Sequence, residues 1–139
     1  MWPVIVFFLL HWYLSVFAQS FFLHRYAAHG MFQMGPFWYR FFYLFTWITQ
    51  GASYLNPRAY AILHMEHHKH SDTEDDPHSP HFFADVLSMM VNTKNVYQGI
   101  LAGKYDNRPD VRIKDYPSWA WVDRIGDSWY TRIAFCAGY

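Results

Sequence analysis

Six of the nine histidines in this 139-residue chain lie within the eighteen residues from His64 to His81. If the start of this stretch is helical, His64, His67 and His68 stand at positions i, i+3 and i+4 and share one face. Neutral imidazole is a common ligand of iron, zinc, copper and nickel. The spacing therefore predicts half of a metal site, and the competing interpretation is a solvated polar helix end.

A second pair of histidines, His24 and His29, directly follows the first apolar segment. On an α-helix their spacing separates the side chains by about 140°, too far for easy chelation of one ion but suited to flanking a site or touching two metals. A zinc-protease motif is not present, because Glu66 follows His64 by two residues. The single Cys136 excludes an internal disulfide and a multi-cysteine zinc site. We therefore expect an imidazole-based metal site.

Charge is distributed unevenly along the chain, which is 22% aromatic and only 16% charged. The first Lys or Arg is Arg25, and the first Asp or Glu is Glu66. This asymmetry indicates contact with membrane lipid. The formal net charge of zero offers no basic surface for a polyanion, so nucleic acid is excluded as a partner.

The uncharged run from Trp2 to Leu23 would span about 33 Å as a helix, enough to cross a bilayer. A cleaved signal peptide is the alternative, but the basic region that should precede the apolar run is missing. All eleven Lys and Arg residues follow the run, which places its C-terminal end and His24 on the cytoplasmic side. His11 is expected to be a packing residue that faces other helices.

A second apolar segment, residues 37–55, follows the break at Gly35-Pro36. A full crossing here would leave the two histidine groups on opposite sides of the bilayer, about 30 Å apart. Polar residues at helical spacing along one side predict an interfacial or re-entrant helix instead. A new helix from about Arg58 then carries His64, His67 and His68.

The rest of the chain is expected to be polar and partly amphipathic. Asp72 to Pro80 is typical of a loop, in which any of Asp72, Glu74, Asp75 and Asp76 could orient a ligating histidine. We expect an amphipathic helix over 83–101, a surface connection over 105–117, an interfacial segment over 119–130 and the start of a further membrane helix over 131–139. The sequence thus predicts one all-α membrane domain over 1–139, built from 1–30, 36–55, 58–81 and 82–139. We expect this domain to be truncated, because the nine residues 131–139 cannot cross a bilayer.

The order of these features resembles the membrane fatty acid desaturases, in particular the acyl-CoA Δ9 (stearoyl-type) enzymes and their bacterial relatives. The resemblance rests on His24-x4-His29 at the end of a membrane helix, His64-x-x-His67-His68 about forty residues on, and Asp76-Pro77-His78. It implies a non-haem di-iron centre and O2-dependent insertion of a cis double bond into a fatty acyl chain. It also implies an acyl substrate carried by CoA or another carrier, and an electron donor such as ferredoxin or cytochrome b5.

The resemblance makes His24, His29, His64, His67 and His68 the metal ligands and gives His78 no ligand role. Two features depart from the family pattern: Gly30 stands where many relatives carry Arg, and the third histidine box is absent. Two irons need roughly eight nitrogen ligands, and the boxes present supply five. We therefore expect this chain alone to bind far fewer than two irons and not to be competent, with metal binding that weakens below about pH 6 as histidines protonate.

Two other functions compete with desaturation. A membrane hydroxylase or other oxygenase can carry similar histidine boxes, and its product would be an alcohol instead of an alkene. A histidine-based membrane metal-binding or transport protein is an alternative of another class. Transporters more often place ligands inside the membrane, and here only His11 is so placed.

Overall fold

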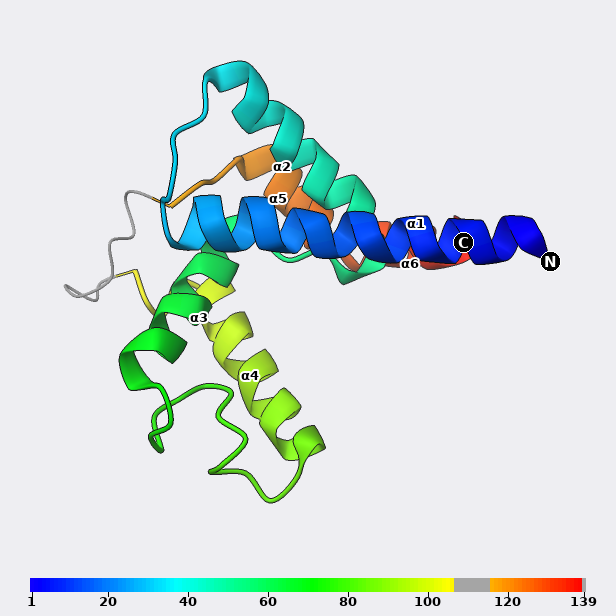
Figure 1. Cartoon of the computed structure of the whole chain (residues 1–139). Coiled ribbons are helices and arrows are strands. Elements are labelled where there is room, and N and C mark those ends of the chain that lie inside the picture. The colour runs from blue at the N-terminus through cyan, green and yellow to red at the C-terminus, as the bar shows by residue number, and fades with distance from the viewer. Residues whose placement is uncertain (107–115, 139) are drawn as a thin grey trace.

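The computed structural model describes residues 1–106 and 116–138, and this part of the chain is all-helical, without a strand. The predicted all-α fold is confirmed. One long helix has α2 (Pro36–Gln50), α3 (Pro57–His70) and α4 (Val86–Leu101) beside its C-terminal half, while α6 (Trp129–Gly138) extends toward its N-terminal end (Figure 1). The predicted connection over 105–117 lies mostly outside the described residues.

The long helix consists of α1 (Trp2–Ala18), which continues directly into the π-helix η1 (Gln19–Ala28). Among the described residues, Trp2–Ala28 is the one helix long and apolar enough to cross a membrane. Most of its side chains are exposed, as lipid contact requires. The helix extends five residues beyond the predicted end at Leu23, so His24 belongs to it.

The aromatic segment folds as α2 (Pro36–Gln50) and a short 3-10 turn, η2 (Gly51–Ser53). Pro36 starts the helix, in agreement with the predicted break. Fifteen residues span only about 22 Å, short of the 30 Å hydrocarbon core, which suits the predicted interfacial or re-entrant helix. Buried Tyr43 from α2 packs with Phe22, Leu23 and Val122 in the main core cluster.

Four further helices complete the described chain: α3 (Pro57–His70), α4 (Val86–Leu101), α5 (Ala120–Gly126) and α6 (Trp129–Gly138). The predicted interfacial segment over 119–130 is thus α5 and the start of α6. α3 packs against η1 and α4, so the helix with the second histidine group lies beside the end of the long helix. Figure 1 shows α3 and α4 together on one side of α1, with α2 on the other.

A buried polar junction joins α2 to α5. The hydroxyl of Tyr43 donates to Asp123 Oδ1 at 2.6 Å, and the Tyr54 hydroxyl donates to the same oxygen at 3.1 Å. The other carboxylate oxygen accepts from the backbone N–H of Trp119 at 3.0 Å. Asp123 therefore satisfies three donors, two of them the hydroxyls of fully buried tyrosines, and this fixes α5 against the core.

Gly126 tests how tightly this junction is packed, because a Cβ there would lie 2.5 Å from Cε1 of the buried Tyr54 ring. We expect Gly126→Ala to lower the free energy of unfolding by about 1–3 kcal/mol through overpacking, although alanine favours a helix by about 1 kcal/mol. Gly99→Ala is the matched control, since its Cβ would meet only the flexible Lys104 side chain at 3.4 Å. Thermal unfolding in detergent measures both, and equal stabilisation by the two variants would contradict the packing.

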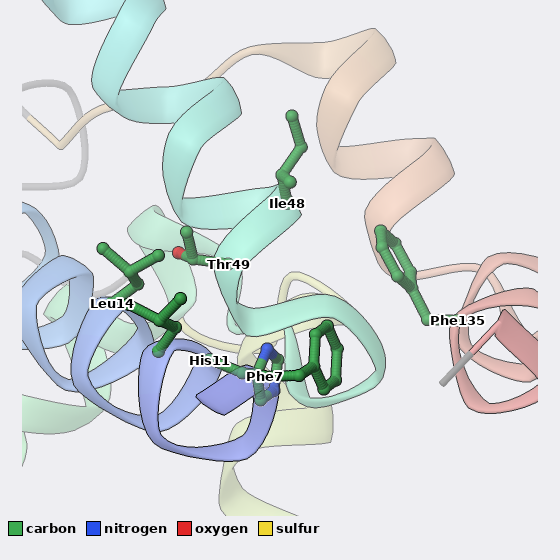
Figure 2. A pocket seen from close by; sticks show the side chains of 7 residues that line it. Phe7, His11, Leu14, Ile48, Thr49 and Phe135 are labelled. Atoms are coloured by element: carbon green, nitrogen blue, oxygen red, sulfur yellow. The ribbon is translucent and has the colours of Figure 1, made fainter. Parts of the chain in front are cut away.

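His11 lies beside a pocket of about 330 Å³ between α1, α2 and α6, shown in Figure 2. Its ring stacks on Phe7 with a centroid distance of 6.0 Å and an interplanar angle of 10°. The other lining residues are almost entirely apolar, among them Leu14, Ile48 and Phe135. This environment agrees with the packing role predicted for His11.

Candidate metal centre

The two histidine motifs meet in space. The Nε2 atoms of His29 and His64 are 3.0 Å apart, although 35 residues separate them in sequence. His68 places its own Nε2 atom 3.0 Å from that of His64, and the ring of His24 lies 4.6 Å from the ring of His64. One potential ligand atom from each of His24, His29, His64 and His68 thus lies within 4.8 Å of the other three. We call these four residues the tetra-histidine cluster.

The π-helix explains why the side chains of His24 and His29 lie close together. The backbone N–H of His29 donates to the carbonyl of His24 at 3.1 Å, an i→i+5 bond, so one turn separates the two side chains. Their ring centroids are 4.6 Å apart. The expectation that this spacing is too wide for one ion was wrong because it assumed an α-helix. No residue type in the segment predicts the wider π-helical turn.

The contacts around His64 suit a metal ion better than hydrogen bonds. An imidazole nitrogen carries either one proton or one lone pair, so His64 Nε2 cannot form good hydrogen bonds to both His29 and His68. Two ligands at right angles, each about 2.1 Å from an ion, lie about 3.0 Å apart, which is the separation found here. The chemistry of the donor set and its spacing therefore fit a transition metal.

The electrostatics of the cluster favour the neutral imidazole at His64 and His29. Burial, followed by the charges of the neighbouring histidines, lowers the pKa of His64 to about 4. Burial and the neighbours His24 and His68 also lower the pKa of His29. A neutral ring keeps a lone pair for a metal, so at neutral pH these groups need not lose a proton before they bind.

His67 does not join the tetra-histidine cluster, which corrects the expectation of one shared face for the second motif. Its Nδ1 atom lies 2.9 Å from both carboxylate oxygens of Asp76, and its ring stacks on that of His78 with a centroid distance of 4.1 Å. His67, Asp76 and His78 form a second group whose potential ligand atoms lie within 4.8 Å of one another. The helix places His67 on the flank of the face that His64 and His68 share.

Asp76 is the anchor of this second group and is almost fully buried. It also accepts backbone N–H bonds from Asp72 at 3.1 Å and from His78 at 3.0 Å. Burial alone would raise the pKa of its carboxyl, but the bonds from the His67 ring and two backbone N–H groups outweigh burial and lower it. Of the four acidic residues that sequence offered as partners of a histidine, the structure thus selects Asp76 for His67.

His78 is the residue that sequence reasoning passed over, although the Asp76-Pro77-His78 motif drew attention to it. Among the described residues, nothing hydrogen-bonds to its buried Nδ1 atom. Burial, followed by the charge of His67, lowers the pKa of His78. The ring also borders an apolar cavity of about 430 Å³ between α3 and α4. His78 therefore belongs to the second group and also lines this cavity.

Asn56 positions α3, the helix that carries His64 and His68. Its side chain accepts from the N–H of Ala59 at 3.0 Å, which caps the helix, and donates to Asp127 Oδ2 at 3.2 Å. Its own backbone N–H donates to the Tyr97 hydroxyl at 2.8 Å. The start of the histidine helix is thus fixed to both α4 and the segment between α5 and α6.

The carboxyl of Asp127 predicts a pH dependence of stability. Burial, followed by the charge of Asp123, raises its pKa to about 6, while Asn56 and Arg132 oppose the shift. A raised pKa means that this contribution is fully present below about pH 4 and is lost as pH rises through 6. We expect the contribution to fall by up to about 3 kcal/mol over that range. Other groups, such as His64, titrate alike in the wild type and in Asp127→Asn, so the difference between their free energies of unfolding should fall from pH 4 to 7. Parallel profiles for the two chains would contradict the assignment.

Comparison with known proteins agrees with this geometry. The sequence model of the family described as fatty acid desaturase matches residues 1–138, a range that includes both histidine motifs. No curated protein and no solved structure gives a significant match. Because the family match covers nearly the whole sequence, the chain belongs to the fatty acid desaturase family.

Proposed function

We propose that this chain forms part of the di-iron centre of an O2-dependent desaturase that introduces a cis double bond into a fatty acyl chain. Membership of the family supports a desaturase-type oxidoreductase in general. The observation that carries the proposal is the tetra-histidine cluster, in which two segments 35 residues apart present imidazole nitrogens at ligand spacing.

The residues divide between two ions. His24, His29, His64 and His68 hold the first iron. His67 offers its Nε2 atom toward a second iron, because Asp76 occupies its Nδ1 atom. The five histidines expected from the resemblance thus all remain proposed ligands, with His67 on its own side of the centre.

Iron bound here supplies the chemistry that side chains lack, which is O2-derived removal of hydrogen from an unactivated methylene group. In the overall reaction the acyl chain loses two hydrogens and O2 is reduced to two waters. Two electrons and two protons must therefore come from outside, and ferredoxin or cytochrome b5 is the class of donor that we propose. The chain itself contributes neutral imidazoles, the buried Asp76 anchor and an apolar surround.

The apolar cavity beside His78 is a reasonable place for part of the acyl substrate. It is lined by Leu55, Tyr60, Leu63 and Met89, and its volume of about 430 Å³ is in the range of ligand pockets. We place the metal centre on the cytoplasmic side of the membrane, since the first two residues of the membrane-helix motif, His24 and Arg25, stand at its C-terminal end. That position also disfavours a transport function, because the tetra-histidine cluster lies at the end of the helix.

Iron analysis and product analysis test the proposal. We expect the purified chain to bind about one iron tightly, since the tetra-histidine cluster supplies one complete donor set. Two tightly bound irons per chain, or none, would contradict this division. A labelled acyl-CoA given with O2 and a reduced ferredoxin to any active preparation should yield an alkene, whereas an alcohol would identify a hydroxylase.

A further inference from the structure

Helix α4 has a buried face and an exposed face. The buried face lies against α3 and contributes Val96 and Ile100 to a core cluster with Ala59 and Ile62. The exposed face is polar in its C-terminal half, which contains Asn95. In its N-terminal half the exposed face is apolar and unpartnered in the described chain: its four residues are between 56% and 73% exposed, namely Val86, Leu87, Met90 and Val91.

These four residues form one continuous strip, because positions i, i+1, i+4 and i+5 lie side by side on a helix. We call it the α4 strip. One turn further along the same face stands the exposed Lys94, and Gln98 follows it. The strip is therefore apolar over the N-terminal half of α4 and polar over the C-terminal half, the pattern expected of a helix that enters an interface at a slant.

The orientation of α4 agrees with that pattern. Figure 1 shows the N-terminal end of α4 pointing obliquely toward the side on which the N-terminus of α1 lies. α1 is part of the membrane-crossing helix, so the apolar half of the strip is directed toward the bilayer and Lys94 away from it. The cavity beside His78 shares Met90 and Lys94 with this face, so cavity and strip are continuous.

We propose that the α4 strip lies in the membrane surface, with its apolar half among the acyl chains and Lys94 at the level of the lipid headgroups. Burial of these side chains in lipid removes an apolar patch from water, and an ammonium group at the rim favours anionic headgroups. Helix α4 is held to the loop that carries Asp76 and His78, because Asn92 and Thr93 donate to the carbonyl of Pro77 at 3.1 and 2.8 Å. Binding of α4 to the membrane surface therefore also fixes the distance of the Asp76 loop from that surface.

Spin labels on the full chain in lipid nanodiscs test this proposal without any need for iron or activity. In a Cys136→Ser background, Leu87→Cys places a label on the strip and Asn95→Cys places the matched control on the polar C-terminal half of the exposed face. We expect the label at 87 to collide with O2 at least about threefold more often than with a water-soluble nickel complex, relative to the label at 95. Anionic lipid should strengthen the difference.

Two outcomes would overturn the proposal. Equal nickel access at the two positions would mean that the α4 strip faces water. Protection of the label at 87 from both O2 and nickel would mean that protein covers it, and dipolar broadening between labels would then identify a second copy of the chain. Neither outcome bears on the metal centre, so failure here is distinguishable from failure of the proposed function.

Discussion

Replacing His64 with alanine is expected to lower the affinity of the chain for Fe(II) or Co(II) by more than about 100-fold. Loss of a residue that only orients a metal ligand lowers the metal affinity 10- to 100-fold. His64 is itself a proposed ligand, so we expect its loss to lower the affinity further. Its Nε2 atom is the one that both His29 and His68 approach at 3.0 Å, and its ring also contacts that of His24. Without it, the two sequence segments retain donors but lose the residue at which they meet.

The measurement is titration of the detergent-solubilised chain with Co(II), whose absorption bands report the number and type of ligands. His81→Ala is the matched control, because it removes an exposed histidine of the same stretch that belongs to neither group. The control should bind like the wild type. Similar affinities for the His64→Ala and wild-type chains would show that the tetra-histidine cluster is not the metal site.

Much of the fold follows from local sequence signals. Proline and glycine at 35–36 and proline at 57 set the starts of α2 and α3, and the absence of charge before Arg25 identifies the long helix. The meeting of the two histidine motifs, one at His24 and His29 and the other on α3, follows from a topological argument. A second membrane crossing between the motifs would have placed them on opposite sides of the bilayer. The structure bears out this convergence with the contact of His29 and His64.

What sequence could not provide is the local geometry within each motif. The π-helical turn at His24 depends on hydrogen bonds that propensity does not encode, and it alone brings His29 onto the face of His24. The separation of His67 from His68 depends on a partner nine residues away in a loop, where four acidic residues are equally plausible by composition. Burial distinguishes Asp76 from its exposed neighbour Asp75, and burial is a property of the folded chain.

The second large effect is expected from Asp76→Asn, through the tautomer of His67. An ionised carboxylate only accepts, so the His67 ring must carry its proton on Nδ1 and keep a lone pair on Nε2 for a metal. In the wild type, the His67 ring and two backbone N–H groups share the two carboxylate oxygens of Asp76. An amide at position 76 would offer these donors only one oxygen. With that oxygen held by one of the two backbone N–H groups, the NH2 faces His67 Nδ1 and favours the tautomer with the proton on Nε2, which leaves no lone pair there for a metal.

We therefore expect Asp76→Asn to weaken the low-affinity binding of a second Co(II), the ion that His67 is proposed to hold, by about 10- to 100-fold, and to leave the tight site of the tetra-histidine cluster unchanged. The ring nitrogen chemical shifts of ¹⁵N-labelled His67 in the metal-free chain report the tautomer directly, and a merely structural loss would not reverse it. Asp75→Asn is the control, since that side chain is exposed and contacts neither histidine group. Because one buried carboxylate determines which nitrogen of His67 is free, an Asp76→Asn chain that kept both the Nδ1–H tautomer and its affinity for the second Co(II) would remove His67 from the proposed centre.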